Sequence, residues 1–491
     1  MTSDVSVQPI SQRLVNQLRQ ALDPRRVHTE AADIDLYKSD ASNIKGRAGV
    51  VCFPVTTHEV QAIVRICAEF NQPFVARGSG TGLAGGATPI DGSVVISTAK
   101  MNRLISVDPV NRFAWIEPGM LNLDLTREVS QHDLHFAPDP SSQQSCTIGG
   151  NVANNSGGPH CLADGVTSSH ILACEVVLSD GSLVMLGGEE PEPHGLDLRG
   201  AFIGSEGMFG ITTKICVRLT QNYTAVKTML MDFTTVQAGA ETVSAIIAAG
   251  MVPAALEMMD QLCLEAVEAY IHAGLPTDAA AALLVEVSGL PHAVTDDTER
   301  ISEIGRAHGA RTIRIAQDEA ERALLWKGRK TAFGAIARIK PNYYLHDTVV
   351  PRRKLNEVLQ EVYRIAQRHD LLVLNVFHAG DGNLHPLILF NANNPDELHR
   401  CELFGADILE TSVAMGGTVS GEHGVGVEKL NSMCVQFTTE ENAQMLAVKA
   451  AFDPAGTLNP GKVIPSLSRC AEYGKMLVRG GQISHPDLPR F

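Results

Sequence analysis

Residues 77–86 read RGSGTGLAGG, and Gly80, Gly82 and Gly85 within them match the G-x-G-x-x-G pattern of a dinucleotide-binding turn. In a Rossmann fold this turn opens a helix, whose N-terminal N–H groups and dipole hold the pyrophosphate. Here Pro89 and a following Asp-Gly pair interrupt the chain, and the next residues, SVVIS, are typical of a strand. The pattern therefore predicts a loop between two strands, whose bare backbone N–H groups form an anion-binding nest. A tight structural turn is the alternative for the loop taken alone.

The segments on either side of this loop alternate between helical and extended patterns. Upstream, Thr56 and Glu59 predict a capping box, and apolar residues at helical spacing predict a helix that ends before a strand at 73–77. Downstream, 103–107 and 113–117 flank turn residues and predict a hairpin. A second hairpin is predicted for EVVLSDGSLVML, which turns at an Asp-Gly pair. The order before the loop is βαβ-like, and the missing helix after it is the departure from a Rossmann unit.

A second region of small residues lies at Gly149–Gly158, where nearly every residue is Gly, Asn, Ser or Ala. This composition lets the backbone approach a large planar ligand closely. A disordered linker is the alternative, but Ile148 and Val152 are spaced to pack against a core. The motif GSEGMFGI follows at 204–211.

The composition of the chain limits its class. With 491 residues, of which 44% are hydrophobic and 19% charged, it is expected to form two or three folded domains. A formal net charge of −15 argues against binding to nucleic acid or to an anionic membrane. The N-terminus has no signal-peptide pattern and no later stretch reaches 18 apolar residues, so we expect a cytoplasmic protein without direct membrane insertion. The ten cysteines show no C-x-x-C spacing, which predicts no iron–sulfur site within this chain.

A group of histidines and a glutamate suggests a metal site. Residues 371–390 predict a strand, a Gly-Asp-Gly turn and a second strand, which would let His378 and His385 face one point, and SGEHGVG places Glu422 beside His423. Two imidazoles and a carboxylate suit Zn²⁺, Mn²⁺ or Fe²⁺, with one position left open for a substrate. Because neighbours in an extended segment point apart, His423 is predicted to act as a general base instead. Core histidines that only form hydrogen bonds are the alternative.

RGSGTGLAGG, PDPSS, IGGNVANNSGG and GSEGMFGI occur in this order, and together they resemble the FAD-binding half of the vanillyl-alcohol-oxidase/p-cresol-methylhydroxylase flavoprotein family. The resemblance implies an α+β fold, in which a two-subdomain FAD-binding domain precedes a C-terminal α+β substrate (cap) domain. FAD would lie between the subdomains with its diphosphate on the glycine loop, and no helix dipole would be involved. Noncovalent binding is expected because the loop holds no histidine, although His135 and His160 leave covalent attachment open.

The resemblance also implies domain boundaries and cofactor-binding residues. The expected parts are a helical lead-in at 1–45, the FAD-binding domain at 46–222, the substrate domain at 223–440, and a C-terminal segment at 441–491 that returns to the FAD domain. The residues expected to bind FAD are Gly78, Ser79, Gly80, Thr81, Gly82, Pro138, Asp139, Ser142, Gly149, Gly150, Asn151, Asn154, Ser156, Gly157, Glu206, Ile211 and Asn459.

The second half resembles a narrower group, the FAD-linked 2-hydroxy-acid dehydrogenases, and above all the FAD-linked subunits of glycolate dehydrogenase, also called glycolate oxidase. The motifs that carry this resemblance are YYLHDTVVPR, VFHAGDGNLHPLILF, SGEHGVG, VKAAFDPAGTLNPGK and RCAEYGKM. The implied reaction is oxidation of glycolate to glyoxylate by hydride transfer to the flavin. Oxidation of D-lactate to pyruvate, direct reduction of O₂, and a role mainly in assembly of a membrane-associated complex are the alternatives. The implied partners are an iron–sulfur subunit and a second FAD-domain subunit, with a quinone beyond them and peripheral attachment to the inner membrane.

The implied chemistry assigns a role to each candidate residue. A divalent metal on His378, His385 and Glu422 would lower the pKa of the substrate hydroxyl, and His423 would accept its proton. Arg329 is the position that the resemblance favours for binding the substrate carboxylate. Arg352 is a second candidate, for which a solvated surface arginine is the preferred interpretation. Leu345 and His346 stand where the hydroxyglutarate branch uses a lysine, which favours a monocarboxylate, while Leu196 and Met208–Phe209 depart from the usual motifs near the flavin.

Overall fold

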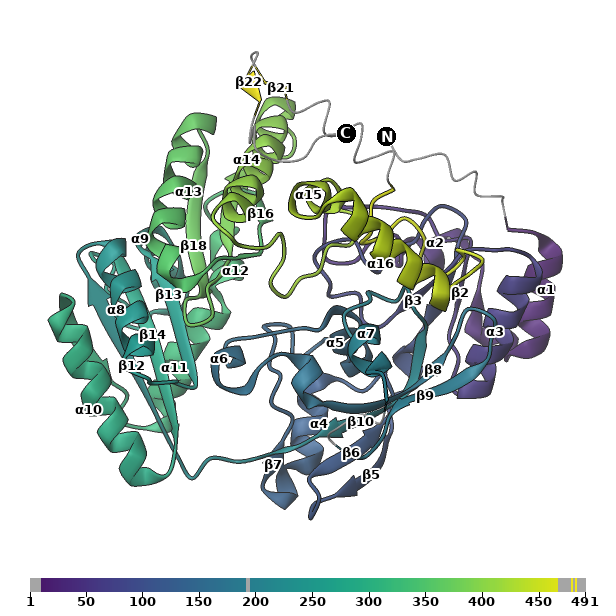
Figure 1. Ribbon diagram of the computed structural model, residues 1–491, viewed down its shortest axis with the longest axis horizontal. Helices are drawn as coiled ribbons and strands as arrows, with labels where there is room; N and C mark the ends of the chain where they lie inside the picture. Colours follow the sequence, from purple (N-terminus) through teal and green to yellow (C-terminus); the bar gives the residue numbers. More distant parts are fainter. Residues whose placement is uncertain (1–9, 191–194, 467–477, 480–481, 484–491) are drawn as a thin grey trace. The chain divides into compact units, whose positions relative to one another are not determined.

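A computed structural model describes residues 10–190 and 195–466, together with the backbone of 478–479 and 482–483. The chain divides into two compact units (Figure 1). The first unit comprises residues 1–157, 166–222 and 422–491, and the second comprises 158–165 and 223–421. The motif RCAEYGKM lies outside the described residues. In the described part of the chain, no helix combines the length and the apolar composition needed to cross a bilayer.

The first unit contains two main sheets. One is four-stranded with the order β1-β2-β4-β3, and the other is a five-stranded antiparallel sheet with the order β5-β6-β10-β8-β9. The bounds of the elements in this unit are α1 Gln12–Ala21, β1 Val27–His28, α2 Ala31–Asp35, β2 Val50–Cys52, α3 Thr57–Glu69, β3 Phe74–Arg77, β4 Val94–Ser97, β5 Leu104–Asp108, β6 Phe113–Ile116, α4 Asn122–Val129, β7 Leu134–His135, α5 Ile148–Asn154, β8 Ile171–Val177, β9 Leu183–Gly187, α7 Leu198–Phe202, β10 Ile211–Arg218, β11 Thr220–Gln221, α15 Leu430–Gln436 and α16 Thr439–Phe452.

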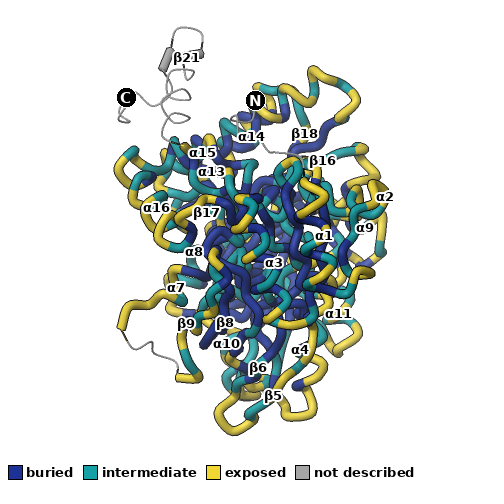
Figure 2. Tube along the Cα trace, turned by 90° about the vertical axis from the view of Figure 1, so that its right-hand side faces the viewer, coloured by how far each residue is buried: buried dark blue, intermediate teal, exposed yellow. Residues whose placement is uncertain are grey.

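The glycine loop connects β3 to β4, which are adjacent and parallel in the four-stranded sheet. No helix occurs between Gly78 and Ser93, so the expected departure from a Rossmann unit is confirmed. Both predicted hairpins are present, as β5 with β6 and as β8 with β9. Strand β8 is buried along its whole length, whereas β9, at the edge of the sheet, has an exposed residue at every second position (Figure 2).

Helix α3 begins as predicted but without the full capping box. The Thr56 side chain accepts a hydrogen bond from the Glu59 backbone N–H at 3.2 Å. The Glu59 carboxylate does not return to Thr56, because it accepts from the backbone N–H of Val55 at 2.7 Å and pairs with both terminal nitrogens of Arg26. The local motif therefore marks the helix start correctly, while a distant arginine redirects the second half of the box.

The small-residue region begins as a helix, α5, capped by the Thr147 side chain on the backbone N–H of Gly150 at 3.2 Å. Ile148 and Val152 are fully buried in the core of the five-stranded sheet. The segment is therefore part of a packed domain, which rules out the linker alternative for this helix. Asn155 ends the helix with a left-handed φ of 51°.

The second unit is built on one large, mainly antiparallel sheet with the path β15-β12-β14-β13-β18-β19-β17, to which β20 and β16 are attached through β18. The bounds of its elements are α6 Cys161–Asp164, β12 Ala225–Phe233, α8 Val236–Ala248, β13 Ala255–Asp260, α9 Gln261–Ile271, β14 Ala281–Gly289, α10 Pro291–Ala307, β15 Ala310–Ile315, α11 Glu319–Lys330, α12 Ala332–Ile336, β16 Asn342–Leu345, β17 Thr348–Val349, α13 Leu355–His369, β18 Leu372–His378, β19 Asn383–Leu384, β20 Pro386–Phe390 and α14 Pro395–Ala414.

Helices cover both faces of this sheet, which explains why its central strands are apolar at nearly every position. Side chains from α8, α10, α13 and α14 pack on one face, around Met229, Met258 and Leu283. Side chains from α9, α11 and α12 pack on the other face, around Met259 and Leu284. Successive residues of β13 and β14 thus point to opposite cores, as the two-residue period of a strand requires.

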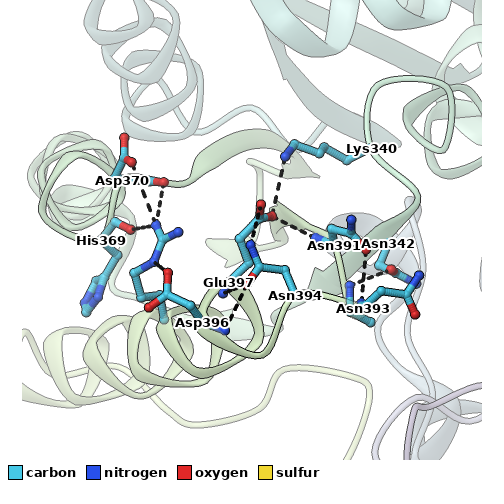
Figure 3. Close-up of polar contacts among 11 residues, drawn as sticks. Lys340, Asn342, His369, Asp370, Asn391, Asn393, Asn394, Asp396 and Glu397 are labelled. Carbon is cyan, nitrogen blue, oxygen red and sulfur yellow. Dashed lines mark hydrogen bonds and ion pairs between the residues drawn. The ribbon is translucent and has the colours of Figure 1, made fainter.

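The start of α14 fixes the end of β20 through the polar contacts drawn in Figure 3. The Asn394 side chain caps α14 by accepting from the backbone N–H of Asp396 at 3.1 Å. The Glu397 carboxylate accepts from the backbone N–H of Asn391, just beyond β20, at 2.8 Å. Arg400 donates to the backbone carbonyl of His369, at the end of α13, at 2.5 Å. These contacts hold the hairpin of β18 and β20, which carries the candidate histidines.

Candidate active site

The glycine loop presents a row of backbone donors. Among the described residues, no backbone N–H group from Gly78 to Gly86 donates a hydrogen bond. The loop is partly exposed, and a row of backbone N–H groups without a protein partner is typical of an anion-binding nest. Gly80 has a left-handed φ of 74°, and a Cβ atom there would lie 2.1 Å from Nη2 of Arg77. Only glycine fits at this position, and a buried guanidinium lies directly under the loop.

The carbonyl groups of the same loop are held by the C-terminal motif LNPGK. Lys462 donates from Nζ to the carbonyl oxygens of Gly85 at 2.6 Å and Thr88 at 2.5 Å. Asn459 donates from Nδ2 to the carbonyl oxygen of Gly86 at 3.0 Å, and its Oδ1 is buried without a partner among the described residues. Burial lowers the pKa of Lys462 to about 8. The loop is thus fixed through its acceptors, while its donors remain available.

Two further elements of the first unit approach this loop. A Cβ atom on Gly78 would lie 2.2 Å from Oγ1 of Thr147, so the loop packs against the start of α5. Glu206 lies in the GSEGMFGI turn with a left-handed φ of 49°, and its carboxylate accepts from the backbone N–H groups of Val425 at 2.7 Å and Gly426 at 2.9 Å. Burial raises the pKa of Glu206 to about 7. The Glu206 side chain therefore holds the SGEHGVG loop in place.

The other residues expected to bind FAD lie on several segments of the first unit. Asn122 links two of them, because its Nδ2 donates to the Pro138 carbonyl oxygen at 2.9 Å and to Asn151 Oδ1 at 3.0 Å. Asn154 donates from Nδ2 to the carbonyl oxygen of His423 at 3.2 Å. Gly149, Gly150 and Ser156 lie along or just after α5, Asp139 and Ser142 lie in the segment before it, and Ile211 begins β10.

In the second unit, two of the candidate residues, Arg329 and His378, contact one carboxylate. Glu257 on β13 accepts a hydrogen bond from Nε of Arg329 at 2.6 Å and another from Nδ1 of His378 at 2.7 Å. The side chains of Glu257 and Arg329 are at most 1% exposed. Arg329 is therefore a buried cation rather than a solvated surface arginine, whereas Arg352 is exposed at the start of a short 3-10 helix.

His378 and His385 approach each other as the sequence predicted. Their ring centroids are 5.0 Å apart and the rings are nearly perpendicular. Potential ligand atoms of His378 and His385 lie within 4.8 Å of each other, and the same holds for Asp347 and His385. Because Glu257 accepts from Nδ1 of His378, the lone pair of that ring lies on Nε2. The two imidazoles and their carboxylate neighbours are a donor set that fits a divalent metal ion.

The chain passes from the second unit to the first between Gly421 and Glu422. Asp347 accepts from the Ser420 hydroxyl at 2.7 Å and from the backbone N–H of Gly421 at 2.9 Å. A Cβ atom on Gly421 would lie 2.6 Å from Oδ1 of Asn383, the residue that pairs with His378 across the turn. Glu422 is the next residue in the chain. One peptide bond therefore joins it to Gly421, which lies beside Asn383 at the end of the turn after His378.

Comparison with known proteins identifies the family of this chain. A model of an FAD binding domain matches residues 48–187, and a model of the C-terminal domain of FAD linked oxidases matches residues 223–463. Glycolate oxidase subunit GlcD of Escherichia coli K12 is 47% identical over 465 residues, which cover 95% of this chain and 93% of that protein. The chain belongs to the FAD-linked oxidase family.

Two other relatives of this FAD-linked oxidase cover most of its length. Glycolate oxidase subunit GlcD of Bacillus subtilis 168 is 39% identical, over 94% of this chain and 98% of that protein. A D-lactate dehydrogenase of Anaerostipes hadrus is 31% identical, over 85% and 90%. The chain is therefore an FAD-linked oxidoreductase, and the family resemblance drawn from its motifs is confirmed.

Solved structures confirm the expected fold class. A 4-ethylphenol oxidase from Gulosibacter chungangensis matches with a TM-score of 0.77 at 19% identity, covering 92% of this chain and 97% of that one. A p-cresol methylhydroxylase matches with a TM-score of 0.76 at 18% identity, covering 94% and 99%. At such low identities the likeness concerns the fold alone. It bears out the α+β fold of an FAD-binding domain with a C-terminal domain of the oxidase type.

Three residues near these sites were not singled out from the sequence. Glu257 is the most informative of them, because an acid in the middle of the apolar strand ALEMMD needs a buried partner, and that signal was available. Arg77 opens the quoted glycine motif, and Lys462 closes LNPGK. The places of Arg77 and Lys462 in the sequence do not indicate that both side chains lie against the glycine loop.

Proposed function

We propose that this FAD-linked oxidase oxidises a small 2-hydroxy acid, with glycolate as the substrate and glyoxylate as the product. The observation that supports it most is the carboxylate of Glu257 shared between Arg329 and His378. It brings a buried cation suited to a substrate carboxylate next to an imidazole suited to a metal. The relatives named glycolate oxidase subunit favour glycolate, and the D-lactate dehydrogenase relative favours D-lactate as the second candidate.

The first unit would hold FAD on its unpartnered backbone donors. FAD, when bound, accepts the hydride that leaves the carbinol carbon of the substrate. The N–H groups of Gly78 to Gly82 would donate to the diphosphate, with Arg77 and Lys462 supplying positive charge next to the loop. The remaining cofactor residues are the glycines, polar residues and Asn459 predicted from the sequence. We propose noncovalent binding and the domain division at residues 45, 222 and 440.

The substrate would be held by residues on both sides of its hydroxyl-bearing carbon. Arg329 uses Nε for Glu257, and its Nη1 and Nη2 have no hydrogen-bond partner among the described residues, so both could donate to a carboxylate. His378, His385 and Glu422 would hold a divalent ion, Zn²⁺, Mn²⁺ or Fe²⁺, which polarises the substrate oxygens. His423 would accept the hydroxyl proton on a ring nitrogen.

Electrons would leave this chain through other proteins. The relatives that are subunits of glycolate oxidase suggest a multi-subunit complex. We propose an iron–sulfur subunit and a second FAD-domain subunit as partners, a cytoplasmic location, and peripheral attachment at the inner membrane through those partners. Arg352 is assigned no role in the site.

An anaerobic titration tests the proposed function directly. Purified protein reconstituted with FAD is mixed with glycolate, D-lactate, L-lactate or D-2-hydroxyglutarate, and loss of the flavin absorbance is followed. Glycolate is expected to bleach the flavin at the lowest concentration, and elemental analysis is expected to find one divalent metal per chain. A colourless protein, or a flavin that no 2-hydroxy acid reduces, would contradict the proposal. Peroxide formation in air would indicate a direct oxidase instead.

A further inference from the structure

A row of polar side chains crosses the central strands β14, β13 and β18 of the large sheet in the second unit. Glu286 on β14 lies opposite Ala255 on β13, and Glu257 is two residues further along β13, so both glutamates point to the same face. Glu257 in turn lies directly opposite His378 on β18. Leu230, Met259 and Leu284 on the same face belong to the core formed with α9, α11 and α12.

Helix α11 covers this polar row with three side chains spaced along one of its faces. Arg322 donates to Glu286 from Nε at 2.9 Å and from Nη2 at 2.9 Å, and Trp326 donates from Nε1 to Glu286 at 2.6 Å. Arg329, two turns after Arg322, reaches Glu257. Although burial alone would raise the pKa of Glu286, hydrogen bonds from His160 and Arg322 hold it well below its usual range. The helix is therefore fixed in rotation and along its axis.

We propose that Glu257 is a positioning residue that orients the substrate-binding arginine and a metal-ligating histidine at once. The proposal rests on the function proposed above. One carboxylate oxygen, Oε2, is used by Arg329 and the other, Oε1, by His378. A rotation of the carboxylate that improves one hydrogen bond weakens the other, so the side chains of Arg329 and His378 are oriented relative to each other. Arg329 has no other carboxylate partner among the described residues.

Each half of this arrangement has a chemical consequence. An acceptor on Nδ1 of His378 fixes the tautomer in which Nε2 carries the lone pair, and it raises the basicity of that nitrogen toward a metal. On the other side, Glu257 occupies only Nε of Arg329, which leaves the two terminal nitrogens as a planar pair of donors. Glu257 thus prepares both groups without itself touching the substrate.

Substitution by glutamine separates this role from simple packing. Glu257→Gln keeps the size of the side chain but offers one acceptor oxygen, so only one of the two donors can be satisfied. We expect the variant to bind its divalent ion about 10-fold to 100-fold more weakly, and its KM for glycolate to rise by roughly the same factor, with retention of FAD. Asp232→Asn is the matched control, because Asp232 is an equally buried carboxylate of the same sheet that pairs with Arg311 instead.

The measurements are made on the full chain loaded with FAD. Metal affinity is determined by competition with a chelator, and the tautomer of His378 by ¹⁵N shifts of labelled histidine in the metal-free protein. Loss of metal affinity, a raised KM and a changed tautomer in Glu257→Gln, all absent in Asp232→Asn, would support the proposal. A response of only one of metal affinity and KM identifies the donor that the glutamine oxygen keeps, and it still supports the shared carboxylate. The proposal is overturned if the tautomer, the metal affinity and KM all stay at their wild-type values. If none of the 2-hydroxy acids reduces the flavin of the wild-type protein, the proposed function fails. The tautomer of His378 alone then decides whether Glu257 positions that histidine.

Discussion

Lys462 donates a hydrogen bond from Nζ to the carbonyl oxygen of Gly85 at 2.6 Å, although the two residues are 377 positions apart. This contact ties the C-terminal LNPGK motif to the glycine loop near the start of the chain. Because the amine satisfies the carbonyl groups of the loop, the loop conformation that leaves its N–H groups available is stabilised by a distant segment.

Replacing Lys462 with Met should weaken FAD binding. The substitution leaves the carbonyl groups of Gly85 and Thr88 without their buried donor, and a hydrogen bond to a charged group is worth about 1.5–3 kcal/mol. We expect the dissociation constant for FAD to rise by about 10-fold to 100-fold, measured by the quenching of FAD fluorescence on titration with apoprotein. Lys45→Met, at an exposed position of the same unit, is the control and should bind FAD as the wild type does. Equal affinity of the two variants would contradict the assigned role.

The contact between Gly78 and Thr147 predicts non-additive effects of two substitutions. Gly78→Ala would place a Cβ atom 2.2 Å from Oγ1 of Thr147, and Thr147→Ala would remove the cap of α5 at a cost of about 1 kcal/mol. With Oγ1 gone, the nearest atom to the new Cβ is Cβ of residue 147 at 3.5 Å, an ordinary contact. The double variant should therefore melt at a higher temperature than Gly78→Ala alone. A double variant that loses the sum of the two single effects would show that the loop does not pack there.

Glu206 should make stability depend on pH between about 4.5 and about 7. Burial raises its pKa to about 7 in the folded state, so the folded protein retains a proton that the unfolded chain releases above its usual pKa. The stability associated with this group is fully present below about pH 4.5 and is lost as the pH rises through about 7, by about 3 kcal/mol in total. Glu206→Gln cannot titrate, and its melting temperature should fall less between pH 5 and pH 7.5 than that of the wild type. Parallel pH profiles of the two proteins would contradict the prediction.

His423→Ala should yield a yellow, folded protein that reduces its flavin slowly. The substitution removes the proposed proton acceptor but keeps the backbone carbonyl that accepts from Asn154, so the loop remains attached. The rate of flavin reduction by glycolate in stopped-flow experiments is expected to fall by about 10²-fold to 10⁴-fold, with unchanged FAD content. Turnover within a few-fold of the wild type would remove His423 as the base.

Arg329→Lys and Arg352→Lys form a matched pair that tests the substrate clamp. Lysine retains the positive charge that Glu257 requires, but it lacks the planar pair of donors that binds a carboxylate. We expect Arg329→Lys to raise KM for glycolate by roughly 10-fold or more, because Arg329 is buried beside Glu257. Arg352 is exposed, and its variant should show an unchanged KM in steady-state assays with an artificial acceptor. Equal KM values for the two variants would show that the clamp has been misassigned.

Much of the fold could be predicted because its signals are local. The Pro and Asp-Gly breaks after Gly86 showed that no helix follows the glycine loop, and the turn residues near Asp108 and Gly181 located both hairpins. The pairing of His378 with His385 also follows from local sequence, since the two residues flank one short turn. The capping box at Thr56 was right about the helix start and wrong about the partner of Glu59, because Arg26 competes for its carboxylate.

The sequence by itself determined the two hairpins, the glycine loop, the family and the histidine pair, since each depends on residues close together in the chain or on motifs quoted whole. Only the tertiary structure showed that Glu257 serves both Arg329 and His378, and that Lys462 holds the loop at Gly85. Those contacts depend on which strands become neighbours, in what register, and which face of α11 turns to the sheet. The packing of the whole core sets these relationships, and residues separated by tens or hundreds of positions carry no local signal of them.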